Sequence, residues 1–217
     1  MLGVRRDVSA ALFAVLVLGI LFAYSRAGWL NLAVALAAML LVFSLRAGGA
    51  RAVGGALALA LVVGGLAGAA LAFTGSVSFL EERARVQAYD SERFSAQASG
   101  VELGFGHALG IGPGQFELSR PVSAHSIYVR VLAEQGVLGL ATLVALLAGT
   151  LALAVRNALL GADAYGVGAA ALLGAWCGLL VNGAFVDTLH WRHLWLVAAL
   201  IWVAAVRSRR VGIRSHV

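Results

Sequence analysis

The residues best suited to chemistry lie in positions 104–139, where glycines, prolines, charged side chains, a histidine and a tyrosine occur together. His125 is the main candidate for a base, because an imidazole that titrates near neutral pH can accept a proton from a hydroxyl group. A helix is expected to begin near Ser123, a suitable N-cap residue, and to run to Glu134. His125 and Tyr128 would then share one face of that helix. An interfacial histidine with a hydrogen-bonded ring is an equally good interpretation.

A glycine-rich turn precedes the expected helix. Gly110, Gly112 and Gly114 surround Pro113 in this turn, and the exposed backbone N–H groups of such a turn can cradle an anion. The turn is not the phosphate-binding loop of nucleotide hydrolases, because the pattern GxxxxGK[ST] is absent and the chain contains no lysine. A plain turn is the simpler interpretation of the spacing.

Among the arginines expected on the outer side of a membrane, four are candidates for binding: Arg26, Arg93, Arg120 and Arg192. Arg26 lies at the outer end of a predicted span, where the positive-inside rule disfavours a basic residue, and polar residues kept in such places are often functional. Guanidinium groups bind phosphate oxygens through pairs of parallel hydrogen bonds. Several of them at one face therefore suit a diphosphate ligand.

Other polar residues have simpler interpretations. His190 and His193 are three residues apart, with Asp187 nearby, but this set lacks further ligands, so we predict no metal site and no cofactor. The i,i+4 spacing of Arg130 and Glu134 most simply predicts a surface ion pair.

The composition is that of a polytopic membrane protein. The chain has 217 residues, of which 61% are hydrophobic and 12% charged, whereas a soluble domain carries about a quarter charged residues. Several apolar stretches are long enough to cross a bilayer core of about 30 Å. We predict an all-α transmembrane helical bundle forming one membrane domain over residues 1–217, with about six spans, at residues 8–24, 27–45, 52–73, 136–155, 165–186 and 190–206.

Residues 74–135 are too polar to span and are predicted to form one large extracytoplasmic loop. Within this loop, residues 78–97 have the spacing of an amphipathic helix lying on the membrane surface. Residues 100–121 are rich in turn formers and are predicted to be mostly turns.

The net charge of +6 follows the predicted topology. The inner side would hold nine arginines and two aspartates, which gives +7, and the outer side seven arginines and eight acidic residues, which gives −1; the two sum to +6. This asymmetry is the positive-inside pattern, with both termini cytoplasmic. It accounts for the basic excess without a nucleic-acid partner.

Four segments together resemble the O-antigen ligase and polymerase family of bacterial envelope glycosyltransferases. They are SRAGWL (25–30), SERF (91–94), the block GIGPGQF (110–116) with AHSIYVRVLAEQGVLGL (124–140), and VDTLHWRHLW (186–195). The block around the histidine resembles the glycine turn and histidine helix of that family. Members of the family have more spans than this chain, which resembles their second half.

The resemblance implies an enzyme of the bacterial cytoplasmic (inner) membrane that moves a glycan from an undecaprenyl-diphosphate carrier to an acceptor glycan or lipid. It implies that His125 is the general base and that Arg26 and Arg93 hold the diphosphate, in metal-independent chemistry with inversion at the anomeric carbon. The expected partners are those two substrates, membrane lipids and a missing N-terminal half. Residues expected to bind substrate are Gly112, Gly114, Tyr128, Arg120, Asp187 and Arg192.

Two alternatives stay open. One is a non-catalytic membrane fragment or partner subunit of such an enzyme. The other is a peptidoglycan polymerase of the shape, elongation and division type, which relies on an acidic residue in its outer loop, whereas this loop concentrates arginine and histidine. A transporter is disfavoured, because no ionisable residue lies in the middle of any predicted span.

Overall fold

The computed structural model describes residues 2–46, 54, 82, 85, 88–119 and 122–214. The described residues are helical, apart from turns and one isolated bridge between Ala164 and Val167, and contain no β-strand. This confirms the all-α class for that part of the chain. The helices are α1 (Leu2–Phe22), α2 (Arg26–Arg46), α5 (Ala88–Gly106), α6 (Gln115–Ser119), α7 (Ile127–Leu160), α8 (Ala169–Asn182) and α9 (Arg192–Arg214).

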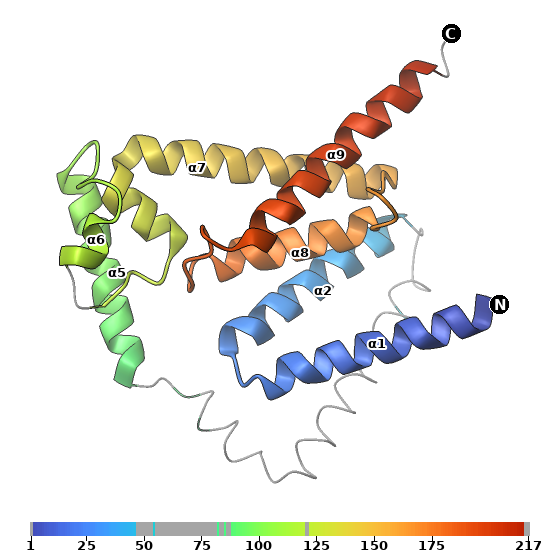
Figure 1. The fold of residues 1–217 in the computed structure, drawn as a ribbon, viewed down its shortest axis with the longest axis horizontal. Coiled ribbons are helices and arrows are strands. Elements are labelled where there is room, and N and C mark those ends of the chain that lie inside the picture. Colours follow the sequence, from blue (N-terminus) through green and yellow to red (C-terminus); the bar gives the residue numbers. More distant parts are fainter. Residues whose placement is uncertain are drawn as a thin grey trace.

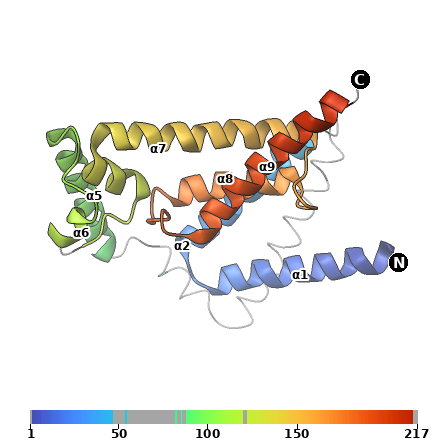
Figure 2. The same cartoon turned by 45° about the horizontal axis from the view of Figure 1, so that its top comes forward.

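The helices form a bundle with α5 and α6 at one end, as Figures 1 and 2 show. The N-terminal ends of α2, α7 and α9 face α5 and α6, whereas both chain termini lie at the opposite end. The short helix α8 packs against α2, α7 and α9, and its Trp176 side chain is 1% exposed. The main hydrophobic core of the described residues therefore surrounds α8.

Glycines let α8 approach α2 closely. A Cβ atom added at Gly174 would lie 2.6 Å from the Ala35 carbonyl oxygen, and one added at Gly178 would overlap the Asn31 side chain. Small residues four apart allow helix backbones to meet in this way, which is common between membrane helices.

Two of these helices, α2 and α7, are long and apolar enough to cross a membrane. They cover the predicted spans 27–45 and 136–155. Shorter apolar helices lie at Ala11–Phe22 in α1 and at α8, within the predicted spans 8–24 and 165–186. The predicted span 52–73 lies outside the described residues except for Gly54, which is helical.

The last two predicted spans differ from the helices in their bounds. Helix α8 covers only 169–182 of the predicted 165–186, because the chain turns at Gly166 with a φ of 84° and turns again from Gly183 onward. Helix α9 begins at Arg192 and continues to Arg214, beyond the predicted end at residue 206.

Helix α7 consists of two segments that meet at Gly136, where φ is 68° and ψ is −168°. The sequence predicted that a short helix ends and a span begins near this glycine, and the helix does break at Gly136. A break in a helix deprives nearby carbonyls of their N–H partners. Here the glycine-rich turn supplies them: Ile111 N–H donates to Ala133 O at 2.9 Å and Gly112 N–H to Glu134 O at 3.0 Å.

The first segment of α7 begins later than expected. Its N-cap is Ser126, whose hydroxyl accepts a hydrogen bond from Val129 N–H, so the predicted start near Ser123 is wrong. His125 precedes the helix and has a φ of 45°. The prediction that His125 and Tyr128 share a helix face is therefore also wrong.

The prediction that residues 100–121 are mostly turns is only partly correct, because α5 continues to Gly106 and α6 follows at Gln115. Gly100 and Gly104 lie inside α5 because they allow close contact with α7. A Cβ atom at Gly104 would lie 2.7 Å from the Leu132 carbonyl oxygen. Of the predicted amphipathic helix, residues 88–97 are helical; the part before them lies outside the described residues except Glu82 and Arg85.

We expect Gly136→Ala to destabilise the protein by about 2–4 kcal/mol. An alanine at this φ is strained, and its Cβ would lie 2.6 Å from the Ala108 carbonyl carbon. The measurement is the unfolding midpoint of the purified protein in detergent. Gly149→Ala, in the regular part of α7 with no atom within 4 Å of the added Cβ, is the control. It should be neutral or slightly stabilising, and an equal loss in both variants would contradict the role given to Gly136.

Candidate functional site

Arg26, the first residue of α2, lies in a cluster with residues of α5. One of its Nη atoms is 2.6 Å from Asp90 Oδ1 and 3.0 Å from the Tyr89 hydroxyl, and the other donates to the Arg85 carbonyl oxygen. The Asp90 side chain is only 8% exposed, whereas that of Arg26 is 32% exposed. The guanidinium is therefore oriented by α5 while part of it reaches the surface.

A cavity of about 460 Å³ opens beside this cluster. Arg26 and Arg93 both line it, together with the carboxylate-bearing Asp90. The remaining lining is largely apolar or aromatic and includes Ala23, Tyr24, Ala27, Leu30, Tyr89, Phe94, Phe185 and Val186. The cavity thus combines two guanidinium groups with an apolar wall. This arrangement suits a ligand with an anionic head group and an apolar tail.

The turn after α8 ties α5 to this cavity. Arg93 donates from Nη2 to the Phe185 carbonyl oxygen, and Gln97 Nε2 donates to Ala184 O at 3.3 Å. Among the described residues, no carboxylate forms an ion pair with Arg93. Its positive charge is therefore not neutralised by a salt bridge in the described part of the chain.

His125 lies within electrostatic reach of Arg93. Partial burial lowers the pKa of His125, and the positive charge of Arg93 lowers it further, while the carboxylates of Asp187 and Glu117 raise it by less. The net effect holds the pKa below its ordinary value of 6.5, so the imidazole is neutral at pH 7. A neutral imidazole is the form that can accept a proton.

The backbone on both sides of His125 is fixed. Ala124 is 1% exposed and packs with Phe116 and Ala133, and Ser126 caps α7. Ile127 N–H donates to Gly183 O at 2.9 Å. A left-handed φ at a residue other than glycine is uncommon and persists where its surroundings enforce it, often at functional sites.

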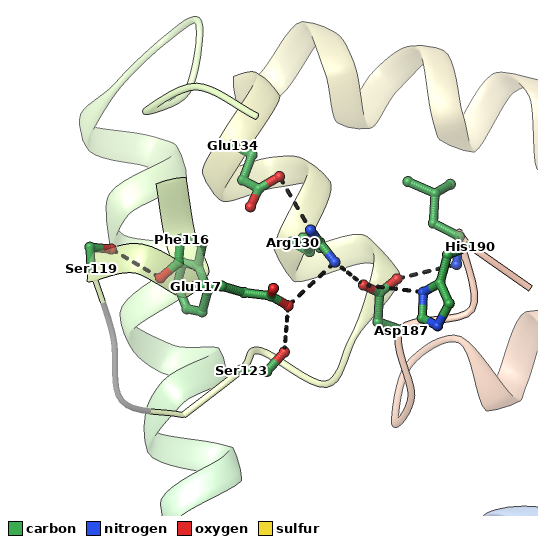
Figure 3. Close-up of polar contacts among 9 residues, drawn as sticks. Phe116, Glu117, Ser119, Ser123, Arg130, Glu134, Asp187 and His190 are labelled. Carbon is green, nitrogen blue, oxygen red and sulfur yellow. Dashed lines mark hydrogen bonds and ion pairs between the residues drawn. The ribbon is translucent and has the colours of Figure 1, made fainter. Parts of the chain in front are cut away.

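A second cluster surrounds Arg130, as Figure 3 shows. Arg130 Nη1 forms an ion pair with Asp187 Oδ2 and lies 3.4 Å from Glu117 Oε1, while its Nε lies 3.5 Å from Glu134 Oε2. The expected pair of Arg130 with Glu134 exists, but it is not a surface pair, because the Glu134 side chain is 6% exposed. The i,i+4 spacing indicated this contact; nothing in the sequence indicated those to Glu117 and Asp187.

Neither His125 nor the other predicted site residues among the described ones line the cavity; only Arg26 and Arg93 do. Tyr128 donates its hydroxyl to the Leu180 carbonyl oxygen at 2.8 Å, a bond between α7 and α8. Gly112 uses its N–H to bond Glu134 O, which favours a structural turn over an anion cradle, and Gly114 has a φ of 75° in the same turn. Arg192 begins α9 with an exposed side chain, and Arg120 lies outside the described residues.

The histidines near α9 do not assemble a metal site. His190 Nδ1 lies 4.0 Å from Asp187 Oδ2, and the His193 ring packs on Trp191 with ring centroids 4.9 Å apart. Within the described ranges, no group of three or more His, Cys, Asp or Glu side chains could hold a metal ion.

We expect Arg26 and Asp90 to be energetically coupled. In a double-mutant cycle with Arg26→Met and Asp90→Asn, the coupling should be about 0.5–3 kcal/mol, measured from unfolding midpoints in detergent. Arg26→Met combined with Asp163→Asn, which alters the connection between α7 and α8, should instead be additive. Additivity in the first cycle would show that the ion pair does not stabilise the wall of the cavity.

Comparison of the chain with protein-family models, with curated proteins and with solved structures gives no match.

Proposed function

We propose that the chain is a multi-spanning glycosyltransferase of the bacterial cytoplasmic membrane, resembling O-antigen ligases and polymerases. It moves a glycan from an undecaprenyl-diphosphate carrier to an acceptor sugar hydroxyl at the outer face. The observation that carries the proposal is the convergence of His125, Arg93 and Arg26 at one end of the bundle. These three residues come from distant parts of the chain, and the cavity between α2 and α5 has both guanidinium groups in its wall.

Exposed apolar side chains support a membrane location with about six spans. Soluble monomers rarely expose large continuous apolar surfaces. Here the helices of the bundle expose large hydrophobic side chains along their length, among them Leu12, Val15, Leu16, Leu41, Phe43, Leu138, Val144, Leu146, Leu196, Trp202 and Val206. Two helices long enough to span fit the same interpretation.

Some polar groups inside the bundle are hydrogen-bonded, as a hydrocarbon environment favours, whereas the buried Oδ1 atoms of Asn157 and Asn182 have no partner among the described residues. Thr150 donates to the Leu146 carbonyl oxygen and accepts from Trp202 Nε1, and the Asn157 amide donates to Ile201 O at 2.8 Å. The bonds from Trp202 to Thr150 and from Asn157 to Ile201 join α7 to α9, and Thr150, Ile201 and Trp202 lie within predicted spans.

The two ends of the bundle differ in the charges that they carry. Arg46 lies close to Gly161 at the C-terminal end of α7, and the Arg207 guanidinium stacks over the Tyr165 ring at 4.9 Å. The acidic residues Asp90, Glu117 and Asp187 belong to the other end, which carries the cavity, and there they pair with Arg26 and Arg130. Arginines that are offset by carboxylates at this end fit an orientation with both termini cytoplasmic and the α5–α6 end extracytoplasmic.

In the proposed reaction, the acceptor hydroxyl gives its proton to the neutral imidazole of His125 and its oxygen attacks the anomeric carbon. The bond from that carbon to the carrier diphosphate breaks, with inversion of configuration. Arg26 and Arg93 stabilise the charge that develops on the leaving diphosphate, the task that a metal ion performs elsewhere. The apolar wall of the cavity would contact the first part of the isoprenoid chain.

Diphosphate binding at Arg26 must compete with Asp90. A guanidinium has five donors, and two of its contacts here are to the Tyr89 hydroxyl and the Arg85 carbonyl oxygen. A dianionic or trianionic head group can displace a hydroxyl or a carbonyl oxygen more easily than it can displace the Asp90 carboxylate. Arg93, which donates to the Phe185 carbonyl oxygen, offers the second binding group.

We expect His125→Ala to abolish the long glycan ladder on the surface of the producing cell, because the variant has no base for the acceptor hydroxyl. The ladder is read on a gel of surface polysaccharide, together with the amount of the chain in the membrane. His107→Ala is the matched control: His107 is exposed in the same loop, its ring bonds only a neighbouring carbonyl among the described residues, and the ladder should persist. An unchanged ladder in His125→Ala, at normal protein level, would support a non-catalytic membrane subunit instead.

A further inference from the structure

Arg130 connects three separate parts of the chain near His125. Glu117 belongs to α6, Glu134 to the first segment of α7, and Asp187 to the connection between α8 and α9. The Arg130 side chain is 25% exposed, and those of Asp187 and Glu134 are 9% and 6% exposed. Among the described residues, Arg130 is the cation that forms ion pairs with these three carboxylates (Figure 3).

Two of these three carboxylates also lie within electrostatic reach of His125. Asp187 and Glu117 act electrostatically on the imidazole, as does Arg93 of α5, so these are the charged groups that reach it from α5, from α6 and from the turn before α9. Arg130 also lies one helical turn after Ser126, the residue that follows His125, because its N–H donates to Ser126 O at 2.9 Å.

We propose that Arg130 is a positioning residue for the proposed glycosyl transfer: it holds Glu117 and Asp187 in ion pairs and so limits how strongly they stabilise a protonated His125. The inference rests on the proposed function, because it assigns Arg130 to the same site. Arg130 acts through the two carboxylates and does not touch the reacting atoms.

One guanidinium faces three carboxylates, so the cluster is already net negative when all are ionised. Without Arg130, Glu117 and Asp187 would lose their guanidinium partner, and the imidazolium form of His125 would be an alternative cation, as would that of His190, whose Nδ1 lies 4.0 Å from Asp187 Oδ2. An opposite charge close by favours the charged form of a titratable group, so the pKa of His125 would rise. A rise of half a pKa unit lowers the fraction of neutral imidazole about threefold at acidic pH.

The test is a pH titration of the His125 imidazole by NMR in the full chain in detergent. His125→Ala identifies the signal among the five histidines. Arg130→Met keeps an unbranched apolar stem and removes the charge, and we expect it to move the titration of His125 to higher pH. Adding Glu117→Gln and Asp187→Asn to Arg130→Met should return the titration to the wild-type position or below it.

The combined variant separates a charge effect from a purely structural one. If Arg130 served only to hold the fold, neutralising the two carboxylates would not reverse its loss. An unchanged titration in folded Arg130→Met, or no reversal in the combined variant, would overturn the inference. If Arg130→Met does not accumulate, Arg130→Lys takes its place: an ammonium cannot reach three carboxylates at once, so the titration should still rise, and an unchanged value would overturn the inference.

The activity readout distinguishes this inference from the proposed function. In an assay of glycan transfer, Arg130→Met should shift the acidic limb of the pH profile upward and leave the alkaline plateau less affected. Absence of transfer in the wild-type chain, with the titration shifted as expected, would overturn the function but not the electrostatic link. Transfer in the wild type with no titration shift in Arg130→Met would overturn only the role of Arg130.

Discussion

The break in α7 at Gly136 is the constraint on which the site depends. A continuous helix would carry residues 127–135 straight on along the line of the span. The positive φ of Gly136 turns this segment aside, and the glycine-rich turn stabilises the break by donating N–H groups to the Ala133 and Glu134 carbonyls. Gly110 and Gly136 must both lack a side chain, because each lies against the backbone of the other segment. The bend brings Arg130 and the start of α7 against the turn that follows α8.

That turn is the second anchor of the site. It accepts hydrogen bonds from Arg93 and Gln97 of α5 and from Ile127 of α7, and it carries Asp187, the partner of Arg130. Each of these bonds joins residues more than fifty positions apart. The site is therefore assembled only when the long loop and the last two helices have folded together. Carbonyl groups of the turn are satisfied by side chains of α5, which fixes the cavity wall where α5 meets Phe185.

Local patterns in the sequence identified the features that depend on neighbouring residues. Apolar runs predicted α2 and most of α7, and Gly136 predicted the junction within α7. The start of that helix was misplaced because Ser123 and Ser126 are both suitable caps, and the buried backbone around Ala124 selects the second. Arg26 and Arg93 were identified from their predicted side of the membrane. The Arg130 cluster was not predicted as a unit, since its contacts to Glu117 and Asp187 depend on the tertiary fold alone.

The two clusters place opposite electrostatic demands on neighbouring groups. A diphosphate needs guanidinium groups that are not fully neutralised, which Arg93 satisfies within the described residues and Arg26 satisfies in part through its exposed edge. A general base must be unprotonated before it can accept a proton. Nearby carboxylates therefore must not stabilise its protonated form. In the proposed reaction Arg93 would serve both demands, because the charge that would bind the leaving group also lowers the pKa of His125. Binding of the proposed anionic carrier would offset that charge and raise the pKa of His125, which would make the imidazole a stronger base.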